Sequence, residues 1–205
     1  MAPRTPVLRP DEYFERNGFD TRPAFAVVGV TALVAVGPVL ALGAFATEQF
    51  ASAGGDATGA VWFFVLLYVG VFLSGVVTAP LVSAVVLHVL ARAACDNEGQ
   101  FEHTLVVASW GLLPAIPVLL AVHGSLGATL ADATTVTPKL FLGELFGTLV
   151  APDAPPLALA AGFLVAGWET YLYGYGLSVA FDADLSRSLV VGGVVAFGGW
   201  LLSLF

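Results

Sequence analysis

Long stretches of apolar residues limit the fold of this chain more than any other feature of its sequence. A helix that crosses the bilayer core needs about 20 predominantly apolar residues. Residues 24–46 contain no charged side chain, and residues 60–91 contain no Asp, Glu, Lys or Arg. Of the 205 residues only 11% are charged, whereas a soluble domain has about 25% charged residues. The sequence therefore predicts a helical membrane protein.

We expect an all-α fold, a polytopic membrane helix bundle with five transmembrane helices. The expected spans cover about residues 24–46, 60–88, 104–122, 157–181 and 188–205. They form a single five-span membrane domain over residues 24–205, which follows a cytoplasmic N-terminal segment of residues 1–23. The stretch at 60–91 exceeds one perpendicular crossing but is too short for two, so it predicts one long, tilted helix.

A short helix is expected in the N-terminal segment, over residues 10–18. Proline suits the first turn of a helix, acidic residues favour its N-terminal end, and Gly18 is a natural stop. The side chains of Leu8, Tyr13, Phe14 and Phe19 predict that this segment rests on the membrane surface, with its helix in the interface. A frayed tail is the alternative.

Two later segments interrupt the pattern of simple spans. The third span contains Pro114 and Pro117, and two prolines so close together remove backbone hydrogen bonds and break the helix. Such a break marks either a packing kink or a transport site. Residues 123–155 form the longest expected loop, in which residues 140–150 are apolar but divided by Glu144. This short segment predicts a surface helix, with a sixth span as the alternative.

The basic residues predict the orientation in the membrane. With five spans, the N-terminal tail and two loops share one side, which holds six of the seven Lys and Arg residues; Lys139 lies on the other. Because basic residues favour the cytoplasmic side, we expect a cell-membrane protein with its N-terminus in the cytoplasm and its C-terminus outside. The excess of 15 acids over 7 bases, with one lysine, is typical of a halophile. A GC-rich genome also replaces lysine by arginine.

The stretch at 157–181 differs from the other spans because Glu169 lies near its centre. A carboxylate in hydrocarbon is costly, so it should face the bundle or be protonated. Helical spacing places Tyr173 on the face of Glu169, and Trp168 and Tyr171 on another. Three interpretations stay open. In the first, Glu169 is a proton or cation site. In the second, Glu169 forms an interhelical hydrogen bond with a backbone carbonyl, Trp or Tyr. In the third, the helix starts later, so that Glu169 lies near the interface.

Enzyme signatures are missing from the sequence. It contains neither a His-Glu-x-x-His motif nor a phosphate-binding Gly-Lys-Ser/Thr loop, and its three histidines are scattered. The single Cys95 excludes an internal disulfide and a zinc site made of several thiolates. We therefore expect no catalytic residues, no cofactor and no metal. Without a basic patch, nucleic acid is not expected as a partner. The expected partners are the lipid bilayer and either other membrane proteins or further copies of the chain.

The layout resembles the Yip family of small polytopic membrane proteins, the Rab-interacting type, in its prokaryotic and haloarchaeal branch. Residues 10–15 (Pro-Asp-Glu-Tyr-Phe-Glu) precede the first span, and residues 109–114 (Ser-Trp-Gly-Leu-Leu-Pro) lie at the proline break. Residues 168–176 precede a short polar loop, and residues 185–187 (Leu-Ser-Arg) open the last span. The chain lacks the Asp-Leu-Tyr-Gly-Pro motif of the eukaryotic members. The resemblance implies five spans, a cytoplasmic N-terminus and no catalysis.

Two functional classes agree with these observations. The first is a non-catalytic membrane scaffold or adaptor, which short loops and missing enzyme motifs favour. The alternative is a small transporter or an ion or proton pathway that uses Glu169 and the helix break at Pro114 and Pro117. The candidate polar site within the membrane consists of Glu169, Tyr173 and Trp168.

Overall fold

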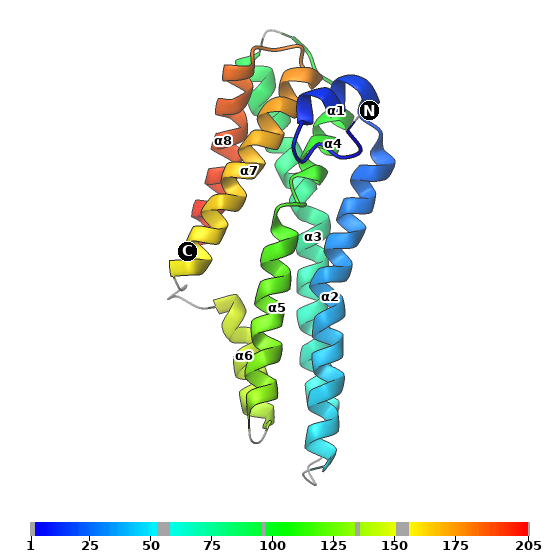
Figure 1. The fold of residues 1–205 in the computed structure, drawn as a ribbon, viewed down its shortest axis with the longest axis vertical. Coiled ribbons are helices and arrows are strands. Elements are labelled where there is room, and N and C mark those ends of the chain that lie inside the picture. The colour runs from blue at the N-terminus through cyan, green and yellow to red at the C-terminus, as the bar shows by residue number, and fades with distance from the viewer. Residues whose placement is uncertain (1–2, 53–57, 96, 134–135, 151–155, 205) are drawn as a thin grey trace. The chain divides into compact units, whose positions relative to one another are not determined.

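The structure, a computed structural model, describes residues 3–52, 58–95, 97–133, 136–150 and 156–204. Within these residues every regular element is a helix, which confirms the all-α prediction. In chain order the helices are α1 Pro10–Asn17, α2 Thr21–Ser52, α3 Thr58–Ala94, α4 Phe101–Trp110, α5 Ala115–Asp132, α6 Pro138–Val150, α7 Pro156–Ala180 and α8 Leu185–Leu202 (Figure 1). The single helix α3 confirms the prediction of one long helix through residues 60–91.

Four stretches in the described part of the chain are long and apolar enough to cross a membrane. They are Thr21–Ser52, Thr58–Ala94, Phe101–Asp132 and Leu185–Leu202, and the third contains both α4 and α5. Helix α7 is not among them, because Glu169 and the Trp and Tyr residues around it lower its hydropathy. The number of five spans therefore stays a prediction.

The contacts divide the chain into two compact units. The first consists of Met1–Val30, Val77–Ala115 and Ala154–Phe205, and the second of Thr31–Val76 and Ile116–Asp153. The division falls inside α2 and α3, so each of these two helices contributes a segment to both units.

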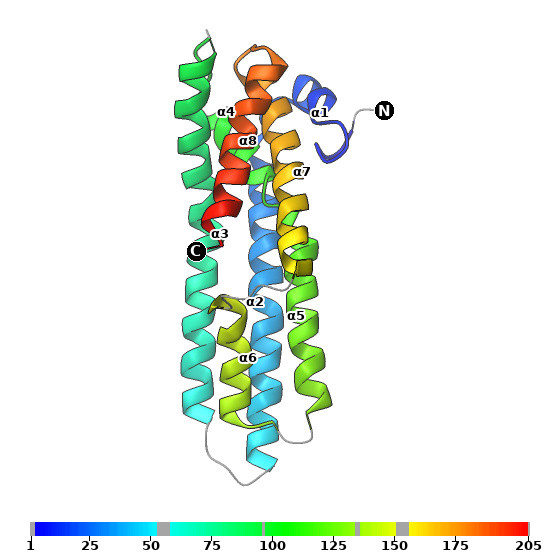
Figure 2. The ribbon, with the colours of Figure 1, turned by 90° about the vertical axis from the view of Figure 1, so that its left-hand side faces the viewer.

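In the first unit, α7 packs against α8, α4 and α1 (Figure 2). Small residues allow the backbones of α7 and α8 to approach closely. A Cβ atom added at Gly192 would lie 3.0 Å from the backbone nitrogen of Gly174 and 3.1 Å from the carbonyl oxygen of Thr170. Any larger residue at Gly192 would therefore separate the two helices.

Helix α1 is held by aromatic side chains that contact the protein. Tyr13 is 4% exposed and Phe14 is 2% exposed. The ring of Tyr13 meets Trp110 edge to face at 5.5 Å between centroids, and Phe19 stacks on His103 at 4.2 Å. These three aromatic residues were expected to rest on the membrane surface. Tyr13 and Phe14 are buried against other helices of the first unit and Phe19 is half-buried, which corrects that expectation for these residues and favours a folded helix over a frayed tail. Leu8, from which the same was expected, is 79% exposed.

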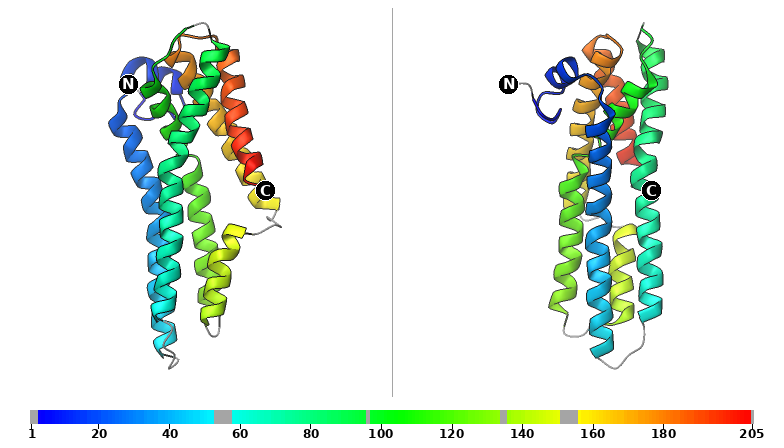
Figure 3. Two further views of the ribbon diagram at one scale, coloured as in Figure 1. Left: turned by 180° about the vertical axis from the view of Figure 1, so that it is seen from behind. Right: turned by 90° about the vertical axis from the view of Figure 1, so that its right-hand side faces the viewer.

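The second unit has its own apolar core, formed by α2, α3, α5 and α6. Its fully buried side chains include Val65 on α3, and Phe141 and Leu145 on α6. Phe146 meets Phe64 edge to face at 5.8 Å between centroids. In each view the axis of α6 runs along the axes of the neighbouring helices of this unit (Figures 1, 2 and 3).

This position of α6 differs from the expected surface helix over residues 140–150. An interfacial helix lies in the plane of the membrane, across the axes of the spanning helices. Phe141 and Leu145, four residues apart on one face, instead place α6 lengthwise in the core of the second unit. The expected loop over residues 123–155 is also shorter than predicted, because α5 continues to Asp132. The length of this segment and the charge of Glu144 were not enough to predict where it lies.

Candidate functional site

One face of α7 is built from residues that recur every three or four positions. Gly162, Ala166, Glu169 and Tyr173 therefore share a side of the helix. All four line a cavity of about 310 Å³ in the first unit. Gly162 and Ala166 have almost no side chain, so Trp200 packs on Gly162 and a hollow remains next to Glu169. The sequence pattern thus produces both the hollow and the carboxylate at its wall.

The other walls of the cavity come from α3, from α4 with the break that follows it, and from α8 with the residue after it, and most of their residues are small or apolar. They are Ala79, Pro80, Ser83, Ala108, Leu112, Val195, Ala196, Gly199, Trp200 and Ser203. Glu169 is the one formally charged side chain among the residues that line the cavity. The cavity therefore presents a single negative centre in mostly apolar surroundings.

Glu169 is partly buried, and no hydrogen bond or ion pair is found for its carboxylate in the described part of the chain. Tyr173, one helical turn later, is 4% exposed. Its hydroxyl hydrogen-bonds the side chain of Ser83 on α3. The sequence correctly predicted that these two residues share a face. The hydroxyl of Tyr173, which the sequence suggested as a partner for Glu169, is instead hydrogen-bonded to Ser83 on α3.

The proline break lies beside this cavity. Helix α4 ends at Trp110 and α5 begins at Ala115, which confirms the predicted interruption. A Cβ atom added at Gly111 would lie 2.6 Å from Cζ of Tyr173, so the ring packs directly on the backbone of the break. Leu112 lines the cavity with Glu169. The structure therefore brings together the carboxylate and the broken helix.

The two prolines have a local explanation at the start of α5. Pro114 immediately precedes this helix, and Pro117 is its third residue. The first four N–H groups of any helix have no intrahelical acceptor, so prolines at these positions remove no helical hydrogen bond, which corrects the expectation that they would. Neither proline lines the cavity. They define where α5 begins.

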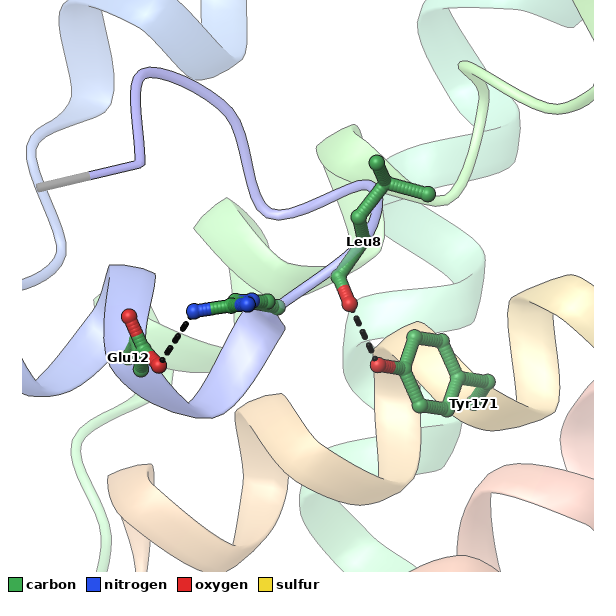
Figure 4. A network of polar contacts seen from close by, with 4 residues as sticks. Leu8, Glu12 and Tyr171 are labelled. Carbon is green, nitrogen blue, oxygen red and sulfur yellow. Dashed lines mark hydrogen bonds and ion pairs between the residues drawn. The ribbon is translucent and has the colours of Figure 1, made fainter.

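Trp168 lies on the other face of α7, away from the lining of the cavity. It is 41% exposed, and its indole Nε1 donates a hydrogen bond of 3.2 Å to the carbonyl of Val7. The hydroxyl of Tyr171 donates to the carbonyl of Leu8 at 2.9 Å (Figure 4). The sequence had grouped Trp168 with Glu169 and Tyr173 in one polar site. The structure corrects this: Trp168 binds the N-terminal segment.

Comparison with known families identifies the chain. The Yip1 domain family matches residues 6–205. The chain belongs to the Yip1 domain family. No curated protein and no solved structure matches it. This Yip1-family chain is therefore a membrane protein of Yip type, as its layout and apolar helices had indicated.

Two residues at the cavity of this Yip1-family protein were not predicted. Ser83 and Trp200 come from α3 and α8, far from α7 in the sequence. A lone serine and a lone tryptophan in apolar helices carry no specific pattern. Trp200 lies against Gly162, where an added Cβ atom would be 2.8 Å from its Nε1. Only the packing of the two helices shows that it belongs to the site.

A second polar feature of the Yip1-family chain lies in the second unit. His123 is 4% exposed and borders a groove with Pro38 and Leu120. Within the described residues, neither of its ring nitrogens has a hydrogen-bond partner. The backbone of Leu119 lies near the ring but forms no hydrogen bond with it. No group of three metal-ligating side chains is found among the described residues.

Proposed function

We propose that this Yip1-family protein is a non-catalytic membrane scaffold or adaptor in the cell membrane. The observation that carries the proposal is the attachment of the N-terminal segment to the first unit. An adaptor needs a surface of fixed shape that a partner can bind. The buried side of α1 anchors Tyr13 and Phe14, while Glu15 and Arg16 are exposed on its other side.

Several polar contacts support a fixed shape for this N-terminal segment. Arg9 forms an ion pair of 3.0 Å with Glu12 (Figure 4). The amide of Asn17 donates to the carbonyl of Pro3 at 3.3 Å and to that of Tyr13 at 3.1 Å. These bonds join the start of the chain to the end of α1. Together with the two donors on α7, they favour one conformation of the segment.

The proposed orientation places this surface in the cytoplasm. Six of the seven basic residues lie in the N-terminal segment and in the two loops that five spans would place on the same side. Basic residues near the ends of spans favour the cytoplasmic side. In this proposal α7 is the fourth span, because the N-terminal segment of the first unit accepts hydrogen bonds from Trp168 and Tyr171, two of the polar side chains that lower its hydropathy. The acidic, lysine-poor composition favours a salt-adapted prokaryote as the source.

Co-purification from native membranes tests the adaptor role. We expect a stable protein partner to be captured with the parent chain and to be lost with Glu15→Lys, which reverses a charge on the exposed side of α1. Glu102→Lys is the matched control, because Glu102 is also an exposed glutamate on the expected cytoplasmic side. Equal loss of the partner in both variants, or no partner in the parent, would contradict the proposal.

A second candidate function is an ion or proton pathway. The observation that favours it is the position of Glu169 beside the helix break, since Leu112 of the break lines the same cavity as Glu169. Broken helices and carboxylates of this kind occur at transport sites. The test is cation or proton flux into vesicles that contain the purified parent chain or Glu169→Gln. Flux that the substitution abolishes would support a pathway, and absence of flux in the parent would exclude it.

A further inference from the structure

We propose that the Glu169 cavity is a binding site for a protonated amine, carried by a lipid head group or by a small free molecule. The proposal goes beyond the adaptor role and does not depend on it. It rests on three properties of the cavity: an unpartnered carboxylate, an aromatic wall, and a volume that fits an amine with its substituents.

The carboxylate is the first reason. Glu169 is partly buried and has no hydrogen-bond or ion-pair partner among the described residues. An ionised carboxylate that leaves water without a partner is costly, and a cation beside it offsets that cost. An ammonium group provides both the charge and the N–H donors that a carboxylate accepts. The cavity therefore lacks a cationic hydrogen-bond donor for Glu169, and a protonated amine would supply one.

The aromatic wall is the second reason. Trp200 lines the cavity and has an electron-rich ring of the kind that attracts cations. Its position is fixed by edge-to-face contacts with Phe163 at 5.6 Å and with Phe197 at 6.3 Å between centroids. A carboxylate and an indole around one hollow are typical of sites that bind substituted ammonium groups. A tryptophan held in place this way adds no new ordering cost when a ligand enters.

The volume and the remaining lining favour an organic cation over a bound metal ion. The cavity has a volume of about 310 Å³, which is far more than one water molecule needs. It holds an amine with several heavy atoms, whereas a single ion would leave most of the space unfilled. Calcium takes 6–8 oxygen ligands, but among the lining residues only Glu169 is a carboxylate. The lining therefore favours an organic cation.

The test measures amine binding to the full chain in lipid nanodiscs. The parent, reconstituted with phosphatidylglycerol plus a minor fraction of phosphatidylethanolamine, should retain the ethanolamine lipid in native mass spectrometry. Glu169→Gln should weaken this retention by about 10- to 100-fold, because it removes a charge-assisted hydrogen bond. Glu144→Gln is the matched control: Glu144 is also a partly buried carboxylate in an apolar helix, but it lies in the second unit.

Two further arms make the outcome decisive. Free ethanolamine added to the parent in detergent distinguishes a free amine from a lipid head group as the ligand. If free ethanolamine raises the melting temperature, the ligand is a free amine. If only the ethanolamine lipid is retained, the ligand is the head group. Trp200→Phe keeps an aromatic ring in place of the indole and should weaken amine binding less than Glu169→Gln does. The inference is overturned if the parent shows no preference for the amine in either form. It is also overturned if Glu169→Gln, folded and monodisperse, binds as the parent does.

Discussion

Substitution of Gly111 by alanine tests how the helix break is joined to α7. The backbone of Gly111 has φ −60° and ψ −20°, which alanine adopts without strain. On propensity alone, alanine is favoured over glycine by about 0.8–1.0 kcal/mol in a helix interior. Any loss of stability must therefore come from the side chain that the new methyl group meets. That side chain is Tyr173, whose Cζ would lie 2.6 Å away.

The magnitude follows from the burial of Tyr173. The ring is 4% exposed, and its hydroxyl is bonded to Ser83, so it cannot move aside without losing contacts. Overpacking of this kind costs about 1–3 kcal/mol. We expect Gly111→Ala to lower the melting temperature in mild detergent by several degrees. The change should also disturb the cavity, because Tyr173 and Leu112 both line it.

Gly167→Ala is the matched control. It introduces the same methyl group on α7 at a position where no atom lies within 4 Å of the added Cβ, so it should be neutral or stabilising. The double variant Gly111→Ala with Tyr173→Leu should recover part of the loss, since leucine lacks the ring that the methyl group meets. If Gly111→Ala were as stable as Gly167→Ala, the close packing of Tyr173 on the break would be refuted.

Three other predictions test the N-terminal segment, the second unit and the loop before α8. Tyr171→Phe removes the donor to Leu8 and should speed tryptic cleavage at Arg4 by about 2- to 10-fold, whereas Tyr175→Phe should not. His123→Leu should leave the melting temperature unchanged or raise it, because the unpaired ring nitrogens are replaced by apolar atoms; a large loss would reveal a partner for the histidine. Hydrogen bonds from Ser186 and Arg187 hold the pKa of Asp184 below its usual value, so its capping contribution is present at neutral pH and is lost as the pH falls through that lowered pKa. Asp184→Asn should remove this part of the acid dependence of thermal stability.

The local features of this fold could be predicted from the sequence, because they depend on neighbouring residues. The break before Ala115, the continuous helix α3 and the shared face of Glu169 and Tyr173 follow from proline chemistry and helical spacing. Periodicity does not show which faces meet. It therefore gave no way to place Ser83 at the cavity, since that position depends on contacts between distant helices.

The burial of α1 and the position of α6 were missed for a related reason. Hydrophobic residues next to a membrane can be buried in lipid or in protein. The same residue types are found in both environments, so residue type alone does not distinguish them. Tyr13 and Phe14 are buried because α4 and α7 offer a surface that fits them, including Gly176, where an added Cβ atom would lie 3.2 Å from Phe14. Phe141 and Leu145 likewise find an apolar core in the second unit. In both cases burial depends on the shape of a surface formed by distant parts of the chain, and the local sequence does not show that shape.

The polar content of α7 explains why the first unit is organised around this helix. With Glu169 and three tyrosines within two turns, α7 falls short of the apolarity of the four other candidate spans. Such a helix is stable in a membrane only if neighbours cover its polar groups. Tyr171 is covered by the N-terminal segment and Tyr173 by α3 and the break at Gly111. Glu169 has no such cover, because it lines a cavity. A helix that joins Trp168, Tyr171 and Tyr173 to protein partners and leaves one carboxylate at a hollow favours an external ligand for that carboxylate.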